Sequence, residues 1–367
     1  MDLKPILKKP FDGDLVSEED AAALLRLPRG EARRPVYEAA DRLNRELNGL
    51  RVSYVFNRNI NFTNACEAEC AFCAYSVQPG APEAFIMSRE EVVRLAGDPP
   101  GLDEVCMVGG LNPEVTFDYL LDLFAAVEEA HPHIHIHALS PMEVDYYAGR
   151  AGLEIREAFG KLVEAGYGSL CGTAAEILVD EVREAICPEK LPTARWLEIV
   201  RTAHAMGLRS TSTILFGHIE RPEHVARHLR LLRDLQQETG GFTEYVPLVF
   251  VPYNTPLGHD RGIKEMIPKE DVFLHYAVAR LFFGRLIRNV QSSWCKLGLD
   301  AATEAFSYGV NDLGGTLFSE SITRSAGGRY GQSLTLQEMA DAIRRAGRVP
   351  IRRDTLYHYL DTAIQTR

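Results

Sequence analysis

The sequence RNINFTNACEAECAFCAYS, residues 58–76, joins a short stretch with alternating apolar side chains to a loop that carries three cysteines. Residues 58–65 predict a strand, because β-branched and aromatic residues alternate with polar ones. Cys66, Cys70 and Cys73 follow with the spacing CxxxCxxC. A strand that ends in a loop rich in metal-ligating residues is typical of the active-site end of a barrel built from alternating strands and helices.

The same strand pattern recurs along the chain, and amphipathic helical stretches separate most of its copies. The candidate strands cover residues 58–65, 104–110, 133–140, 169–175, 209–217, 243–251, 289–294 and 312–317. Eight strands with mostly helical connections predict an α/β fold, a single (β/α)8 TIM-type barrel. Ser17, with an acid three positions later, and Gly49 mark the start and end of helices before the first strand. We expect a helical N-terminal extension over residues 1–50 and the barrel with C-terminal helices over residues 51–367.

Composition and charge limit the classes of partner. The chain has 367 residues, of which 46% are hydrophobic, and its formal net charge is −11. An acidic chain without a basic stripe predicts no nucleic-acid binding and no attraction to anionic membranes. No signal peptide or membrane-spanning stretch is evident, so we expect a cytoplasmic protein. Reducing conditions and an odd number of cysteines, seven, favour free or metal-bound thiols.

Three kinds of metal site compete for the cysteine loop. A structural zinc site normally has four ligands in paired CxxC units, and the chain has no second pair. A ferredoxin-type cluster needs a fourth cysteine in a regular run. Three thiolates on a four-iron cluster leave one iron open, which explains the missing partner. The remaining cysteines, Cys106, Cys171, Cys187 and Cys295, are expected to be small buried side chains.

Glycine and polar residues occupy several other predicted strand ends. Gly109 and Gly110 end the second strand, where missing side chains let a ligand approach the backbone. Thr173 and Glu176 end the fourth strand, and this carboxylate either binds a ligand or caps the next helix.

Histidines repeat along the third predicted strand. Alternation places His133, His135 and His137 on one face. One face of one strand cannot surround a metal ion without ligands from elsewhere. His137 and Ser140, near the strand end, are therefore expected to make polar contacts to a cofactor or substrate.

The CxxxCxxC spacing with Phe72 before the last cysteine resembles the radical S-adenosylmethionine (SAM) superfamily. The resemblance implies a [4Fe-4S] cluster on the three cysteines, whose open iron binds SAM and releases a 5′-deoxyadenosyl radical. The stretch TSTILFGHIE is similar to the superfamily motif that lies against the adenine. The contacts to SAM implied in this way come from Phe72, Tyr75, Gly109, Gly110, Ser140, Thr173, Glu176, Gly217 and Glu220.

Longer stretches resemble one family within this superfamily. GGLNPEVTFDYLLDLFAAVEEAHPHIHIHALSPMEV, GSLCGTAAEIL and VNDLGGTLFSESITRSAG are similar to a family that contains the deazaflavin (FO) synthase subunits and the futalosine-pathway enzymes of menaquinone synthesis. Within them, GTAAEIL, HALSP and ITRSAG resemble the tyrosine-using FO synthase subunits. The resemblance runs from about residue 15 to the C-terminus. It implies a transferase that breaks the Cα–Cβ bond of L-tyrosine and adds the 4-hydroxybenzyl group to 5-amino-6-(D-ribitylamino)uracil.

The resemblance also implies partners and substrate contacts. A reductase or ferredoxin-type protein would donate electrons, and a second radical SAM subunit would complete the deazaflavin, because this chain has one CxxxCxxC motif. The residues expected to hold or act on the substrates are Asn64, His137, Glu176, His218, Asn311 and Asp312. Among these, His137, Glu176, Asn311 and Asp312 are the catalytic candidates.

Two alternatives remain at this point. The loop NTPLG, residues 254–258, resembles the aminofutalosine synthase branch of the same family, so a radical SAM aminofutalosine synthase or futalosine cyclase of menaquinone synthesis is the nearest one. A non-catalytic iron–sulfur or zinc protein on a barrel scaffold is the other, and it predicts a saturated metal site that does not respond to SAM.

Overall fold

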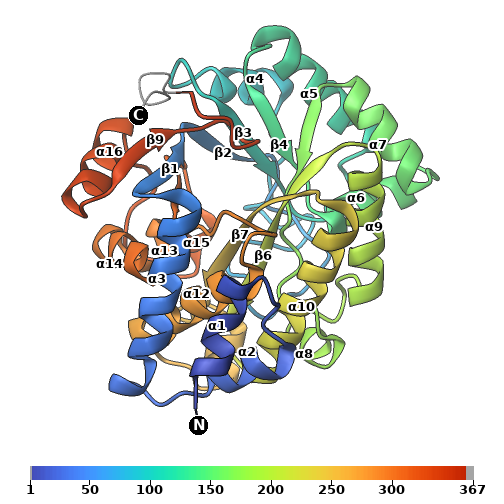
Figure 1. The fold of residues 1–367 in the computed structure, drawn as a ribbon. Coiled ribbons are helices and arrows are strands. Elements are labelled where there is room, and N and C mark those ends of the chain that lie inside the picture. Colours follow the sequence, from blue (N-terminus) through green and yellow to red (C-terminus); the bar gives the residue numbers. More distant parts are fainter. Residues whose placement is uncertain (1, 361–367) are drawn as a thin grey trace.

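The computed structural model describes residues 2–360 as a ring of parallel strands surrounded by helices (Figure 1). The strands are β1 (Arg51–Val55), β2 (Asn57–Asn61), β3 (Glu104–Val108), β4 (His135–Ala138), β5 (Tyr167–Leu170), β6 (Arg209–Phe216), β7 (Phe242–Val249), β8 (Asp312–Gly315) and β9 (Val349–Arg352). The helices are α1 (Lys4–Asp12), α2 (Glu18–Leu25), α3 (Arg34–Asn48), α4 (Arg89–Ala96), α5 (Phe117–Ala130), α6 (Pro141–Arg150), α7 (Ile155–Glu164), α8 (Asp180–Ile186), α9 (Thr193–Ala205), α10 (Pro222–Thr239), α11 (Pro256–Asp260), α12 (Lys269–Phe283), α13 (Trp294–Leu297), α14 (Leu299–Glu304), α15 (Ile322–Ser325) and α16 (Leu336–Arg345). Two short 3-10 helices are η1 (Glu31–Arg33) and η2 (Ala305–Tyr308).

The strands close into a barrel with eight positions around its wall, of which β1 and β2 together fill one and residues 290–291 fill another. β2 to β7 pair in chain order as one sheet, while β8, β1 and β9 form another, and all these pairings are parallel. Phe56 alone separates β1 from β2, so the two form one nearly continuous strand. β1 pairs with β8, and β2 pairs with β3. Single bridges at Val290 and Gln291 join β7 to β8. The predicted α/β fold, a (β/α)8 TIM-type barrel, is confirmed.

Three segments differ from the sequence prediction. The predicted strand at 289–294 is reduced to single bridges. The amide of Val290 donates to the side-chain Oδ1 of Asn311 (3.0 Å) and therefore not to a backbone carbonyl of β8. β1 precedes the first predicted strand. β9 lies where only C-terminal helices are expected. Its Pro350 lacks an amide hydrogen, and it is tolerated because β9 is an edge strand that pairs with β1 alone.

Helices α1 to α3 precede β1. The expected start of α2 is a capping box, in which Ser17 Oγ accepts from the Asp20 amide (3.1 Å) and Asp20 Oδ2 accepts from the Ser17 amide (2.9 Å). Asn44 of α3 donates to the carbonyl of Val310, just before β8, at 2.9 Å. This contact places α3 at the amino-terminal end of the barrel, the end seen in Figure 1.

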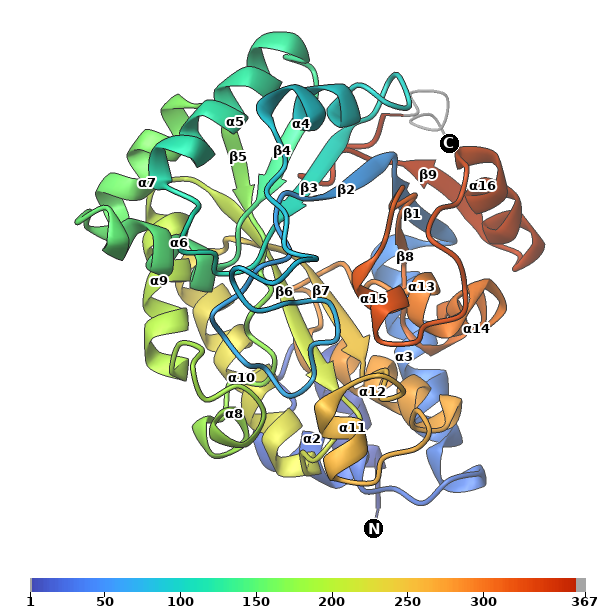
Figure 2. The ribbon, with the colours of Figure 1, turned by 180° about the vertical axis from the view of Figure 1, so that it is seen from behind.

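The opposite end of the barrel carries long loops. Figure 2 shows the loop between β2 and α4 crossing the carboxyl ends of the strands. Along β3, Val105 and Met107 are fully buried under the outer helices, whereas Glu104 and Cys106 line a cavity inside the barrel. This alternation separates an apolar outer core from a polar interior.

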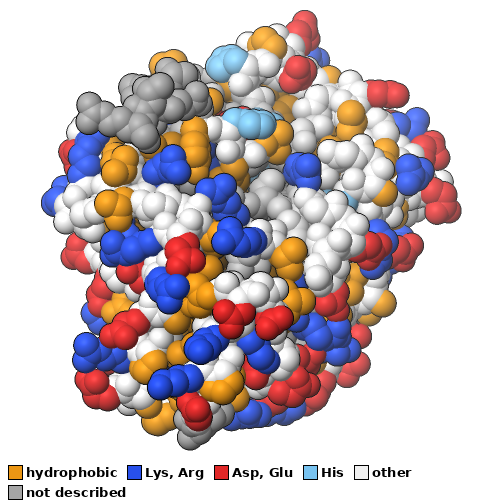
Figure 3. All heavy atoms as spheres, in the orientation of Figure 1, with side chains coloured by type: hydrophobic (Ala, Val, Ile, Leu, Met, Phe, Trp, Pro, Cys, Tyr) orange, Lys and Arg blue, Asp and Glu red, His pale blue; other side chains and the backbone are white. Residues whose placement is uncertain are grey.

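The surface carries mixed charges. On the face shown in Figure 3, Lys and Arg side chains are interspersed with Asp and Glu side chains. Among residues 2–360, no helix has the length and apolar character needed to cross a membrane.

Candidate active site

A cavity of about 450 Å³ runs from the carboxyl ends of the strands into the barrel. The three motif cysteines lie in its wall at the mouth, and charged side chains from the start of β3, from β7 and from the segment after β9 lie in its wall at the closed end. Of the residues predicted to bind a metal, cofactor or substrate, those that line the cavity are Asn64, Cys66, Cys70, Phe72, Cys73, Tyr75, Gly109, Gly110, His137, Ser140, Thr173 and Glu176. Three of the cysteines expected to be buried also line it, namely Cys106, Cys171 and Cys295, and Cys106 is only half-buried.

Side chains at the end of β2 fix the base of the cysteine loop. Asn64 Nδ2 donates to the carbonyl of Glu83 (2.9 Å), and Asn64 Oδ1 accepts from the amide of Phe85 (2.9 Å). Thr63 Oγ1 donates to the carbonyl of Phe85 (2.7 Å). Asn64, expected to contact substrate, therefore closes the loop with both ends of its amide group.

The three motif thiols, those of Cys66, Cys70 and Cys73, are free and lie together in the cavity wall. Among the described residues, no three His, Cys, Asp or Glu side chains are arranged to hold one metal ion. Soft thiolate side chains are the ligands that iron–sulfur clusters take, so the chemistry of these three residues fits such a cluster.

The loop also offers the electrostatics that thiolate ligands require. The amide of Leu111 donates to Cys66 Sγ at 3.3 Å. Burial raises the pKa of the Cys70 thiol to about 12, and the nearby Lys190 partly opposes this rise. A buried thiol of this kind loses its proton when a metal binds it.

The two glycines at the end of β3 are required by close packing. A Cβ on Gly110 would lie 2.0 Å from the carbonyl oxygen of Ala65, and a Cβ on Gly109 would lie 2.7 Å from the Phe62 ring. The backbone after β3 therefore lies directly against the cysteine loop and forms the cavity wall beside Cys66.

Ser140 and Glu143 connect the ends of β3 and β4. They form the capping box of α6, in which Ser140 Oγ donates to Glu143 Oε2 (2.6 Å). Glu143 Oε1 also accepts from the amide of Gly109 (2.8 Å). Burial raises the pKa of Glu143. Glu143 lines the cavity and was missed in the sequence, although Ser140 with an acid three positions later is a recognisable capping box.

Glu176 and Lys190 form an ion pair in the cavity wall. Lys190 Nζ lies 2.6 Å from Glu176 Oε1. The backbone φ is 44° at Glu176 and 60° at Ala174. Both are left-handed conformations that residues other than glycine rarely adopt. Thr173 accepts a hydrogen bond from Trp196 Nε1 through its backbone carbonyl (3.2 Å). The sequence analysis missed Lys190, because the residue lies between α8 and α9, outside any predicted strand end or recognisable motif.

The cavity wall after β8 contains another acid that the sequence did not indicate. Glu320 Oε1 accepts from the amide of Thr323 (2.8 Å). Its other oxygen, Oε2, is buried without a hydrogen-bond partner among the described residues. Tyr75, from the cysteine loop, bonds to the neighbouring Ser321, and burial raises the pKa of the Tyr75 phenol.

The loop after β6 does not contribute to the cavity lining. Glu220 Oε1 accepts from the amide of Gly217 (2.5 Å), and Oε2 accepts from the amide of His218 (2.9 Å). His218 Nε2 bonds to the carbonyl of Leu215 (3.1 Å). Gly217, His218 and Glu220 therefore form a turn whose polar groups bond to one another. Their contacts to SAM and substrate stay a prediction.

Asn311 and Asp312 lie at the opposite end of the barrel from the cysteines. They sit at the amino-terminal end of β8, outside the cavity lining. Asn311 Oδ1 accepts from Arg280 (2.7 Å), and Asp312 Oδ2 accepts from Ser53 (2.6 Å) and from Arg353 (2.7 Å). Their polar atoms hold the barrel together. The prediction counted the pair among polar residues at strand ends, but it stands at the beginning of β8, which is the end of the barrel away from the cysteines.

Comparisons with known proteins agree with this site. A family profile described as "Radical SAM superfamily" matches residues 60–232, and one described as "CofH/MqnC C-terminal region" matches residues 239–366. A protein of Methanococcus maripaludis strain C7, named 5-amino-6-(D-ribitylamino)uracil–L-tyrosine 4-hydroxyphenyl transferase, is 42% identical over 331 residues, or 89% of this chain and 92% of its own. The chain belongs to this family of radical SAM transferases.

Other relatives support the same membership. Proteins with the same name from Methanopyrus kandleri and Methanothermobacter thermautotrophicus are 44% identical over 324 residues and 40% identical over 360 residues. They cover 88% and 98% of this chain, and 88% and 98% of their own lengths. The expected family and the expected enzyme class, a radical SAM transferase, are confirmed. The cofactors of this family are a [4Fe-4S] cluster and SAM.

Solved structures share the fold. Methylornithine synthase has a TM-score of 0.72 and 19% identity over 94% of this chain and 97% of its own. The FeFe-hydrogenase maturase HydG from Carboxydothermus hydrogenoformans has a TM-score of 0.72 and 16% identity over 97% of this chain and 80% of its own. At these identities the likeness extends to the barrel alone.

Proposed function

We propose that this chain transfers the 4-hydroxybenzyl group of L-tyrosine to 5-amino-6-(D-ribitylamino)uracil. The observation that carries this proposal is the 40–44% identity, over nearly the whole chain, to transferases named for these two substrates. The barrel cavity, with three cysteines at its mouth and polar groups along its depth, is suited to the chemistry.

Cys66, Cys70 and Cys73 would hold the cluster at the mouth of the cavity. When bound there, the cluster and SAM supply the radical that removes a hydrogen atom from tyrosine. The barrel wall below them keeps bulk water away from the reacting groups. Phe72, Tyr75, Gly109 and Gly110 surround this position and shape it.

Lys190 and Glu176 would bind SAM through opposite charges. Both lie in the cavity wall. Lys190 is close enough to Cys70 to lower the pKa of that thiol, so the pair lies on the Cys70 side of the cavity. An ammonium suits the carboxylate of SAM, and a carboxylate suits its ribose hydroxyls. The ion pair seen here would then open, and each partner would accept a ligand group in place of the other.

Glu320 and His137 would position the two substrates. The buried, unpaired Oε2 of Glu320 suits the ammonium group of tyrosine. Burial lowers the pKa of His137 to about 4, so its imidazole is neutral, and Ser169 fixes its orientation through Nδ1 (2.7 Å). A neutral imidazole can exchange a hydrogen bond with the uracil edge without introducing charge.

Two partners belong to the same proposal. A reductase or ferredoxin-type protein would supply electrons, and a second radical SAM subunit would close the deazaflavin ring. The menaquinone alternative is not favoured, because the relatives described above carry the transferase name although one matching profile is named for both branches.

Anaerobic turnover tests this function. The cluster-loaded protein is incubated with SAM, a reductant and the aminouracil, with and without L-tyrosine, and the products are identified by mass spectrometry. The proposal predicts a benzylated uracil and 5′-deoxyadenosine only when both substrates are present. Formation of 5′-deoxyadenosine with tyrosine left intact would keep the radical chemistry and reject the substrates.

A further inference from the structure

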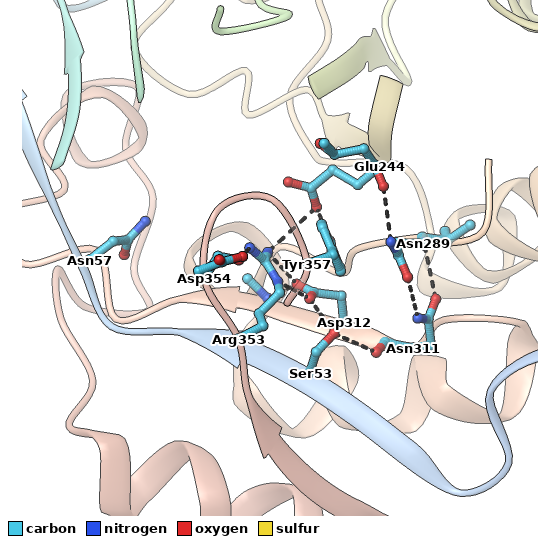
Figure 4. Close-up of polar contacts among 12 residues, drawn as sticks. Ser53, Asn57, Glu244, Asn289, Asn311, Asp312, Arg353, Asp354 and Tyr357 are labelled. Carbon is cyan, nitrogen blue, oxygen red and sulfur yellow. Dashed lines mark hydrogen bonds and ion pairs between the residues drawn. The ribbon is translucent and has the colours of Figure 1, made fainter. Parts of the chain in front are cut away.

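The closed end of the cavity is a buried polar surface, which we call the polar floor. It consists of Asn57, Glu104, Glu244, Arg353 and Thr355. Each of these residues lines the cavity and is at most 5% exposed. Figure 4 shows Glu244 and Arg353 converging there, with Asn57 to one side. The polar floor lies at the amino-terminal ends of the strands, far from the cysteine loop along the barrel axis.

The segment after β9 builds this surface. The amide of Arg353 donates to the carbonyl of Tyr54 (2.9 Å), which extends the pairing of β9 with β1. Arg353 Nε and Nη2 donate to the two oxygens of Asp312, at 2.7 and 3.2 Å. The Tyr357 hydroxyl donates to Glu244 Oε2 (2.7 Å), and the Arg353 guanidinium lies 4.0 Å from the centre of the Tyr357 ring. These contacts hold the floor residues in fixed positions (Figure 4).

Acceptors outnumber donors on the polar floor. Arg353 bonds to Asp312 (2.7 Å), and its Nη2 lies 3.8 Å from Glu244 Oε2, so a single guanidinium is shared between these two acids while Glu104 lies beside them. Glu104 Oε1 accepts from Asn57 (2.8 Å), and Glu244 Oε2 accepts from Tyr357. A side-chain contact from Thr355 also helps to lower the pKa of Glu104.

Thr355 provides a second, independent indication of a ligand. Its hydroxyl is buried, and it makes no hydrogen bond of normal geometry with any described residue, although it lies close enough to Glu104 to help lower the pKa of that carboxyl. A buried hydroxyl without a partner costs about 1–3 kcal/mol unless a ligand or water completes it. The residue lies in the cavity wall, so a ligand in the cavity can reach it.

The chemistry of the floor selects a chain of hydroxyl groups. A carboxylate or phosphate would be repelled by the Glu104 carboxylate, and an apolar tail would leave buried polar groups unpaired. Hydroxyls donate to carboxylates without adding charge, and they also accept from Asn57 or Thr355. The reacting atoms must lie near the cysteines at the mouth, so the unreactive end of a substrate points to the closed end.

We propose that the polar floor binds the ribityl chain of the aminouracil and thereby sets which aminouracil the enzyme accepts. This assignment rests on the proposed function, and it places the uracil ring above the floor with its reacting carbon toward the mouth. A site built to bind substrate hydroxyls discriminates strongly against analogues that lack them. The phenol of tyrosine is the competing occupant, and the experiment separates the two.

The test compares two substrates on three proteins. KM and kcat are measured for 5-amino-6-(D-ribitylamino)uracil and for 5-amino-6-(methylamino)uracil at saturating L-tyrosine, on cluster-loaded wild type, Thr355→Val and Thr303→Val. The KM for L-tyrosine is measured on the same proteins at saturating ribityl substrate. Thr303 is a half-buried residue of α14 outside the cavity lining and serves as the matched control. Calorimetric binding of each aminouracil to the same proteins gives a readout that does not depend on turnover.

The assignment predicts that Thr355→Val raises KM and Kd for the ribityl substrate by roughly 5- to 10-fold, the effect of one lost hydrogen bond. The methylamino analogue, the tyrosine KM and the control variant stay unchanged. Equal losses for both aminouracils, or a rise in the tyrosine KM instead, would overturn it. Equal binding of the ribityl substrate and the analogue by wild type would also exclude the polar floor as the ribityl site. Absence of any benzylated product from wild type would instead overturn the proposed function.

Discussion

Lys190 Nζ lies 2.6 Å from the carboxylate of Glu176 and 5.1 Å from the centre of the Phe72 ring. The pair therefore joins the loop after β5 to the cysteine loop at the mouth of the cavity. Burial alone would lower the pKa of Lys190, but Glu176 and the neighbouring thiols raise it above its ordinary value. The amine is charged at neutral pH and is suited to an anionic ligand group.

Replacing Lys190 with Met should weaken SAM binding and destabilise the fold. The change leaves the Glu176 carboxylate in the cavity wall without its cation, which costs about 3 kcal/mol. We expect Kd for SAM to rise at least roughly 10-fold. Urea denaturation and equilibrium SAM binding measure the two effects. Lys269→Met, which breaks an exposed pair with Glu304, is the control and should change neither by more than about 0.5 kcal/mol.

The double variant Lys190→Met with Glu176→Leu separates charge from packing. It removes both charges, so much of the lost stability should return while SAM binding stays weak. Recovery of SAM affinity in the double variant would contradict the role given to this pair.

Gly110→Ala should displace the cysteine loop. The new Cβ would lie 2.0 Å from the Ala65 carbonyl, and backbone atoms cannot move aside cheaply. We expect a loss of at least about 2 kcal/mol of stability and reduced iron content after reconstitution. Gly160→Ala is the control, because nothing lies within 4 Å of a Cβ there and the residue lies within α7. It should be neutral or stabilise by up to about 1 kcal/mol. Full iron loading of Gly110→Ala would contradict the packing argument.

Glu320→Gln should raise the KM for tyrosine. The amide keeps an oxygen for the Thr323 amide at the start of α15, but it loses the negative charge that faces the cavity. We expect roughly a 10-fold increase in the tyrosine KM with the aminouracil KM unchanged. Glu338→Gln removes the charge of another helix-capping carboxylate, at α16 on the surface, and should leave both constants as they are. A change in kcat alone would argue against binding of the tyrosine ammonium.

Glu244 should make stability depend on pH. Burial raises its pKa from 4.5 to about 7, and Arg353 opposes part of this rise. The folded protein therefore favours the protonated acid, and this contribution is complete below about pH 4.5 and is lost as pH rises toward 7. Glu244→Gln should be less sensitive to pH than wild type in urea denaturation at pH 5 and pH 8. Parallel pH profiles for the two proteins would contradict the burial of this acid.

The sequence identifies the elements whose signals are local. The capping box at Ser17 and the cysteine spacing are recognisable from neighbouring residues, and the alternation of strands and helices predicts the barrel. β9 is missed because Pro350 argues against a strand and the partner that tolerates it, β1, lies about 300 residues earlier.

The depth of the site depends on contacts that no local pattern carries. Glu244, Arg353 and Tyr357 come from β7 and from the segment after β9, and they meet only because the barrel closes. Asn311 and Asp312 show the opposite case, since their polar character is evident in the sequence but their place at the start of β8 makes them structural.

The most direct test of the central claim follows the carbon atoms of tyrosine. Cluster-loaded protein is incubated anaerobically with SAM, a reductant, the aminouracil and L-tyrosine labelled with carbon-13 at Cβ or, separately, at Cα. The account predicts that the benzylated uracil carries the Cβ label and that the Cα label appears only in the small fragment. A product that carries the Cα label, or tyrosine recovered intact while 5′-deoxyadenosine accumulates, would contradict it.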